Sequence, residues 1–97
     1  MLAYRWTCLI KHGRMQEMLE LHTSLPIRPI VGKVRWYTPD ISPQLWVTEL
    51  VVQDEEEMRK FFDEFNATPE AAPFWDKFSA LVEQWVSTER WNVTDYG

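Results

Sequence analysis

The order of strand and helix patterns along this chain repeats once. A short apolar strand leads into an amphipathic helix and a second strand, and after a proline-bearing turn the same order returns. The first set comprises Ala3 to Lys11, Met15 to Leu25 and Val31 to Thr38, and the second comprises Leu45 to Val52, Glu55 to Trp85 and Val86 to Val93. This βαβ–βαβ order uses nearly the whole 97-residue chain. We therefore predict one α+β domain over residues 1–97.

The first helix is predicted from apolar residues at helical spacing and from a stop signal. Its apolar stripe consists of Met15, Met18, Leu19, His22 and Leu25. Pro26 ends this helix, because proline has no backbone N–H and disfavours helical geometry in the residue before it.

The second helical segment is predicted to be broken. Asp54 and Glu57 form a capping box at its start. Asn66 to Pro69 interrupts it, and Thr68 is expected to cap the second piece, with Pro69 in its first turn. The buried stripe before the break consists of Met58, Phe61, Phe62 and Phe65, and the stripe after it of Phe74, Phe78, Leu81, Val82 and Trp85.

Two βαβ units joined by a hairpin predict a ferredoxin-like fold with a four-stranded antiparallel sheet. Because such crossovers are right-handed, both helical segments should cover one face of the sheet and leave the other open. In the first strand, Leu2, Tyr4, Trp6, Cys8 and Ile10 share one face by alternation. An exposed apolar sheet face indicates a partner. We predict a homodimer through the face that the helices leave open, in which two sheets form an α/β barrel.

Composition narrows the class of partner. The net charge is −5 and the ten basic residues are scattered, so a nucleic acid is not expected to bind. Apolar runs are far shorter than the roughly 20 residues that span a bilayer, so no membrane interaction is expected. The N-terminus lacks the pattern of a signal peptide, and Cys8 is a single cysteine. We therefore expect a cytoplasmic protein.

Two segments resemble the dimeric α/β-barrel superfamily, most nearly NIPSNAP-like and antibiotic-biosynthesis-monooxygenase-like small proteins. The first is Tyr4-Arg5-Trp6-Thr7 leading into Lys11-His12-Gly13-Arg14-Met15-Gln16-Glu17-Met18-Leu19, and the second is Phe74-Trp75-Asp76-Lys77-Phe78. The resemblance implies the barrel fold and a ligand site between the helices and the covered sheet face. Families on this scaffold include cofactor-independent quinol monooxygenases, haem-degrading oxygenases and isomerases, so the fold implies no single reaction.

His22 is the candidate catalytic residue. It lies near the centre of an apolar helical stripe, where a histidine facing a pocket would serve as a general base or acid. The alternative is a core histidine bonded to a backbone carbonyl. The candidate substrate-binding residues are the aromatic side chains Tyr4, Trp6, Trp36, Tyr37 and Trp75. Their alternative role is packing in the core and in the dimer interface.

No metal or cofactor is predicted. Two histidines in the whole chain do not make a three-ligand site, and His12 is expected to lie in an exposed loop. The haem-degrading branch has a histidine on its second helix, and the segment from Glu55 to Trp85 has none. Arg5 and Arg35 are expected either to bind a carboxylate or to pair with Glu49 or Glu89, and pairing is favoured.

Two functions follow from this pattern. The first is binding of an apolar aromatic or phenolic molecule, with a monooxygenase- or isomerase-like reaction that uses no cofactor. The second is a non-catalytic dimeric binding or stress-related module, in which the same aromatic side chains form the core. A cavity that ends at His22 would favour the first function.

Overall fold

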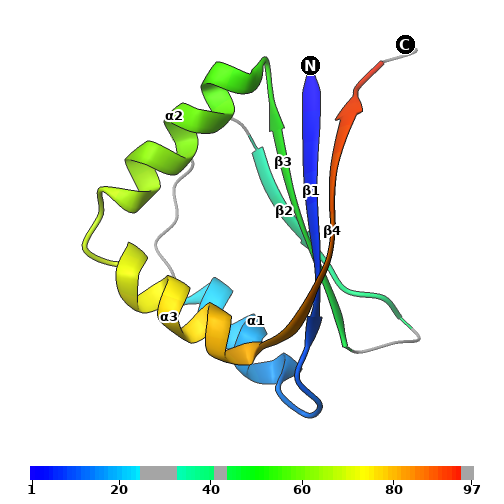
Figure 1. Cartoon of the computed structure of the whole chain (residues 1–97), viewed down its shortest axis with the longest axis vertical. Helices are drawn as coiled ribbons and strands as arrows, with labels where there is room; N and C mark the ends of the chain where they lie inside the picture. The colour runs from blue at the N-terminus through cyan, green and yellow to red at the C-terminus, as the bar shows by residue number, and fades with distance from the viewer. Residues whose placement is uncertain (25–32, 41–43, 95–97) are drawn as a thin grey trace.

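The computed structural model describes residues 1–24, 33–40 and 44–94. In this part of the chain, the elements are β1 (Leu2–Ile10), α1 (Met15–Thr23), β2 (Lys33–Tyr37), β3 (Leu45–Val52), α2 (Glu55–Asn66), α3 (Ala71–Leu81) and β4 (Val82–Asn92). The sheet order is β2-β3-β1-β4, and all neighbouring strands are antiparallel. The three helices lie on one side of the sheet (Figure 1). The predicted ferredoxin-like βαββαβ fold is confirmed.

The core forms where the face of β1 that carries the even-numbered residues meets the helices. Cys8 and Ile10 are buried together with Met18 of α1 and Trp46 of β3. Alternation along β1 is therefore as predicted, because these even-numbered residues face the helices. Phe74, Phe78 and Leu81 of α3 complete this cluster. A second, smaller cluster lies around Tyr4, Leu50 and Val52.

The break in the second helical segment is confirmed, but its end is not where we predicted it. α3 stops at Leu81, and Val82 and Trp85 belong to β4. Val82 pairs with Ile10 of β1, and Trp85 pairs with Cys8. The backbone N–H of Lys11 also donates to the carbonyl of Leu81 at 2.9 Å. Pairing with the central strand therefore outweighs the helical spacing of these residues.

The predicted caps agree only in part with the structure. The Asp54 carboxylate accepts from the Glu57 N–H at 2.9 Å, as a capping box requires. Glu57 reaches back to the N–H of Gln53, one residue earlier than in the standard box. Thr68 does not cap α3, whose N-cap residue is Glu70. Its hydroxyl instead donates to the carbonyl of Phe65 and so satisfies the end of α2.

The stripe on α1 is rotated slightly from the predicted one. Met18 and His22 are buried, but Leu19 is 37% exposed and Leu21 packs against the core in its place. The predicted ends of the first helix at Leu25 and Pro26, and the start of the second strand at Val31, lie outside the described residues. The predicted hairpin is confirmed, since β2 and β3 pair from Lys33 with Val51 to Tyr37 with Val47. Within the described ranges, no helix is long and apolar enough to cross a membrane.

Candidate functional site

A cavity of about 280 Å³ lies between the helices and the covered face of the sheet. Its lining is almost entirely apolar and includes no Asp, Glu, Lys or Arg side chain among the described residues. Aromatic rings from all three helices and from three strands face it. They belong to Trp6, His22, Trp36, Phe61, Phe62, Phe65, Phe74, Trp75, Phe78 and Trp85.

The cavity exists because α2 does not pack closely on the sheet. α3 buries four residues, whereas none of the twelve residues of α2 is fully buried. Figure 1 shows α2 starting near the end of β3 and diverging from the sheet toward α3. One side-chain hydrogen bond joins α3 to α2, because the Trp75 Nε1–H donates to Asn66 Oδ1 at 2.8 Å. Three residues of the predicted stripe on α2, Phe61, Phe62 and Phe65, line the cavity, and the whole stripe is packed against the core while only partly buried.

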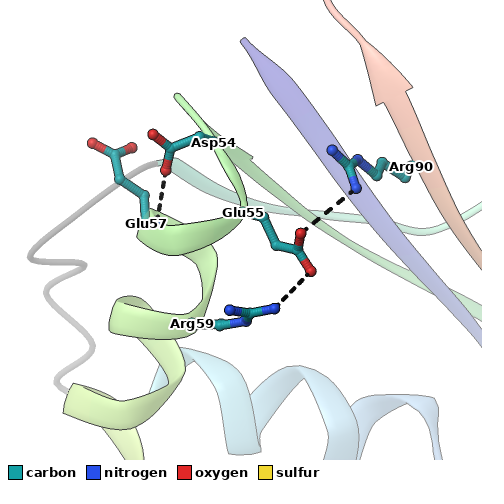
Figure 2. Close-up of polar contacts among 5 residues, drawn as sticks. All are labelled: Asp54, Glu55, Glu57, Arg59 and Arg90. Carbon is teal, nitrogen blue, oxygen red and sulfur yellow. Dashed lines mark hydrogen bonds and ion pairs between the residues drawn. The ribbon is translucent and has the colours of Figure 1, made fainter.

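Polar contacts connect the first turn of α2 to β4. Glu55 Oε1 accepts from Arg59 at 3.2 Å, and its other oxygen lies 4.0 Å from Arg90 Nη1 of β4 (Figure 2). Arg90 also lies over the ring of Tyr4, 5.7 Å from the centroid. All three charged groups are about half exposed or more, so each ion pair contributes little to stability. Through Arg90, these contacts link the start of α2 to β4.

The strand register builds the sheet side of the cavity. Thr48 of β3 lies between Trp6 of β1 and Trp36 of β2 as their direct cross-strand neighbour. All three residues line the cavity. The short side chain of Thr48 between two indoles therefore leaves a hollow with one hydroxyl group at its base.

His22 joins the cavity from α1. It is 4% exposed, and its Nδ1 lies 2.8 Å from the carbonyl oxygen of Met18. Because a carbonyl only accepts, Nδ1 carries the proton and Nε2 of the neutral ring is an acceptor. The described residues offer Nε2 no hydrogen-bond partner. Burial lowers the pKa of His22 below its ordinary value, although the bond to Met18 acts in the opposite direction.

Four aromatic rings surround the imidazole of His22. Trp46 is the nearest, with ring centroids 4.5 Å apart, and Trp36 follows at 5.0 Å. Phe74 and Phe78 of α3 are edge-on at 5.3 and 5.7 Å. This enclosure supplies the desolvation that keeps the ring neutral.

We predict that stability falls on acidification because of His22. The unfolded chain protonates this residue near pH 6.5, whereas the folded chain resists protonation. The stabilising contribution is therefore complete above about pH 6.5 and is lost as the pH falls toward the lower folded-state pKa. Denaturant unfolding between pH 7.5 and 5.5 should show this fall for the wild type and a flatter profile for His22→Leu. His12, which is exposed, provides the control, because His12→Leu should keep the wild-type slope.

Besides His22 and the indoles, two described lining residues carry heteroatoms in their side chains, namely Cys8 and Thr48. Burial raises the pKa of the Cys8 thiol to about 11, so it is not a thiolate nucleophile at neutral pH. Thr48 contributes a hydroxyl. Among the described residues, no three His, Cys, Asp or Glu side chains are grouped as a metal site would require. The cavity is therefore built for apolar contact with a few neutral hydrogen-bonding groups.

The structure brings most of the predicted site residues together, but not all of them. His22, Trp6, Trp36 and Trp75 line the same cavity. Tyr4 is not among the lining residues, although its ring stacks on that of Trp6 with the centroids 5.9 Å apart. The buried Tyr4 hydroxyl has no hydrogen-bond partner among the described residues. Tyr37 lies on the opposite face of the sheet, where its hydroxyl donates to Glu49 at 3.0 Å. Its grouping with His22 was wrong, because odd-numbered residues of β2 point away from the helices.

Sequence reasoning assigned several lining residues only to the core. Phe62 and Phe78 were placed in helical stripes, and Cys8 was placed on one face of the first strand. Thr48 was not singled out, although it is a polar residue between the inward-facing Trp46 and Leu50 of β3. Trp85 was placed at the end of a helix. It is 57% exposed and stacks on Phe78, so the cavity reaches the surface beside β4.

Comparison with known proteins identifies the fold. No protein-family model and no curated protein matches the sequence. A NIPSNAP family protein from Agrobacterium tumefaciens matches with a TM-score of 0.84 and 20% identity, over 99% of this chain and 88% of the other. The chain has the fold of that protein. A NIPSNAP domain protein from Burkholderia xenovorans matches with a TM-score of 0.81 and 17% identity, over 100% and 98% of the two chains.

The same fold also occurs in solved structures that carry another family name. A solved antibiotic biosynthesis monooxygenase matches with a TM-score of 0.76 and 14% identity, over 98% of this chain and 100% of the other. At these identities the likeness concerns the fold alone. It agrees with the resemblance found in the sequence, and the chemistry has to be argued from the cavity itself.

Proposed function

We propose that this protein binds a small, flat, uncharged aromatic molecule that carries a hydroxyl group. The observation that supports this proposal is an aromatic cavity whose described lining residues carry no charged side chain and include the imidazole of His22. A dry apolar cavity of about 150 Å³ holds a single benzene ring. The volume of about 280 Å³ therefore suits one or two fused rings. In this proposal, His22 Nε2 accepts the hydrogen bond from the ligand hydroxyl.

None of the described lining residues is charged, and this favours an uncharged ligand. A carboxylate or phosphate would lose its hydration in the cavity without gaining a cation, which is costly. A phenol loses one hydrogen bond to water and regains it at His22. Ring faces and edges supply the remaining contacts, because stacked and edge-on aromatic pairs are each favourable.

Binding is favoured over proton transfer as the primary function. In a monooxygenase-like reaction, His22 would take the phenolic proton, and the resulting anion would react with dioxygen. The imidazolium and the phenolate would then both lie in a cavity whose other described lining residues are uncharged, and the lowered pKa of His22 opposes that step. Oxygen uptake in the presence of 1-naphthol, measured above a protein-free blank, would indicate catalysis. If no oxygen uptake above the blank is measured, a non-catalytic binding module is the function that is supported.

The test compares two ligands that differ in one hydrogen-bond donor. We expect 1-naphthol to bind the wild type about tenfold more tightly than 1-methoxynaphthalene, since a net hydrogen bond contributes about 1 kcal/mol. Isothermal titration calorimetry measures both affinities. In His22→Leu the preference for the naphthol should disappear, while the affinity for the ether changes little.

His12→Leu is the matched control and should retain the preference. Equal affinities of the wild type for the two ligands would contradict the role of His22. No heat of binding with either ligand would contradict the proposed ligand class.

We also propose that the protein is a homodimer through the open face of the sheet. Met1, Tyr37, Trp91 and Val93 are large, exposed hydrophobic side chains, and all four line a hollow of about 650 Å³ on this face. Exposed apolar surface of this kind is typical of an interface. Light scattering that gave a mass of 11.6 kDa at micromolar concentration would contradict the dimer.

A further inference from the structure

Four charged residues form a single row across the open face of the sheet. Glu49 of β3 pairs in register with Arg35 of β2 on one side and with Arg5 of β1 on the other. Arg5 in turn pairs with Glu89 of β4. Residues that are directly opposite in antiparallel strands project from the same face of the sheet. The order across the four strands is therefore Arg35, Glu49, Arg5, Glu89, with alternating sign; we call it the charge row.

The middle of the charge row is fixed within one protomer. Arg5 Nε donates to Glu49 Oε2 at 2.7 Å, and the Tyr37 hydroxyl donates to Oε1 of the same carboxylate. Glu49 is only 5% exposed, although no helix covers this face. Among the described residues, no ion pair involves Arg35 or Glu89 at the two ends of the row. Both ends belong to the face that we propose to be covered by a second copy.

The charge row is complementary to itself when its direction is reversed. A twofold axis parallel to the strands, midway between two facing sheets, places β2 opposite the partner's β4 and β3 opposite the partner's β1. Arg35 then faces the partner's Glu89, and Glu49 faces the partner's Arg5. All four positions meet an opposite charge. The alternative twofold axis also lies midway between the two sheets, but it runs perpendicular to the strands. It places each charged residue opposite the same residue of the partner, so all four positions meet a like charge.

We infer that the charge row selects the dimer in which the twofold axis runs parallel to the strands. This inference rests on the proposed dimer and adds what determines its geometry. Opposed like charges at an interface cost several kcal/mol, so the perpendicular arrangement is disfavoured. Buried ion pairs contribute more to specificity than to affinity. The surrounding apolar side chains therefore supply the affinity, and the charge row supplies the orientation.

Reversing one end of the row should dissociate the dimer. In Arg35→Glu, the new acid faces the partner's Glu89, and symmetry produces this contact twice. Glu89→Arg opposes two positive charges in the same way. We expect each variant to weaken dimerisation by about 100-fold or more, which sedimentation equilibrium and light scattering can measure.

Combining the two changes separates contacts between protomers from contacts within one. The double variant Arg35→Glu/Glu89→Arg should dimerise within about tenfold of the wild type, because the opposed charges are again of opposite sign. Within one protomer the double variant has more like-charge neighbours than either single variant. A purely intramolecular effect would therefore make it the worst of the three. An equimolar mixture of the two single variants should form a heterodimer, since each end then meets its opposite.

Arg90→Glu is the control for an acid introduced at a basic position of the sheet. Arg90 faces Tyr4 and Glu55 on the helix side, so this variant should remain dimeric. Circular dichroism should show every variant folded. A monomeric wild type would overturn the dimer itself. A dimeric wild type with equally dimeric single variants, or a double variant weaker than both, would overturn the inference about the charge row and leave the dimer standing.

Discussion

Replacing Trp46 with alanine is expected to lower the free energy of unfolding by about 3–5 kcal/mol. Trp46 is 1% exposed, and its ring packs against the imidazole of His22, which lines the cavity. Truncation leaves a void that the paired strands β1 and β3 cannot close. Since small domains are stable by about 5–15 kcal/mol, this loss is a large share of the total.

Trp46→Phe should cost much less, about 1–2 kcal/mol. The Trp46 Nε1–H is buried and has no hydrogen-bond partner among the described residues, and such a group costs about 1–3 kcal/mol. Phenylalanine retains most of the packing and removes the unpaired donor. Urea unfolding measures both variants, with Trp85→Ala as the control at a side chain that is 57% exposed. Equal losses for Trp46→Ala and Trp85→Ala would show that Trp46 is not the core residue that its burial indicates.

The sequence was sufficient to predict the order of elements and the alternation along β1, but not which face of β1 the helices cover. Alternation within strands is a local signal, and so are the prolines and capping residues at the ends of helices. These signals placed the break between α2 and α3 correctly. The end of α3 was missed because it is not a local property. Val82 and Trp85 fit a helical stripe as well as a strand, and the register with Ile10 and Cys8 decides between the two.

The candidate site was predictable in its central residue and not in its shape. His22 stands out because it interrupts an apolar stripe. The hollow at Thr48 depends on the indoles of Trp6 and Trp36, which come from two different strands. The distance of α2 from the sheet depends on how it meets α3. Neither the hollow nor the position of α2 follows from a hydrophobic pattern. Such a pattern indicates which residues share a face of an element, but not which residues of other elements pack against that face.

Thr48→Phe is expected to abolish binding of 1-naphthol while the protein remains folded. The phenyl ring would occupy the hollow between Trp6 and Trp36, which is the space that we propose for the ligand ring. We expect affinity to fall by about 100-fold or more, because a filled cavity cannot bury the probe. Stability should rise by about 1 kcal/mol, since cross-strand aromatic neighbours are favourable and the cavity provides room.

Thr48→Val separates the loss of space from the loss of the hydroxyl. Valine has nearly the shape of threonine, so the cavity stays open, and the affinity for 1-naphthol should change by less than about threefold if His22 is the acceptor. Calorimetry gives the affinities, and thermal unfolding gives the stabilities. Unchanged binding by Thr48→Phe would mean that the probe occupies another site. A Thr48→Phe variant that is strongly destabilised would mean that the hollow is too small for a ring, because overpacking costs about 1–3 kcal/mol. Binding lost together with stability gained is the combination that only an open, ligand-sized cavity at this position explains.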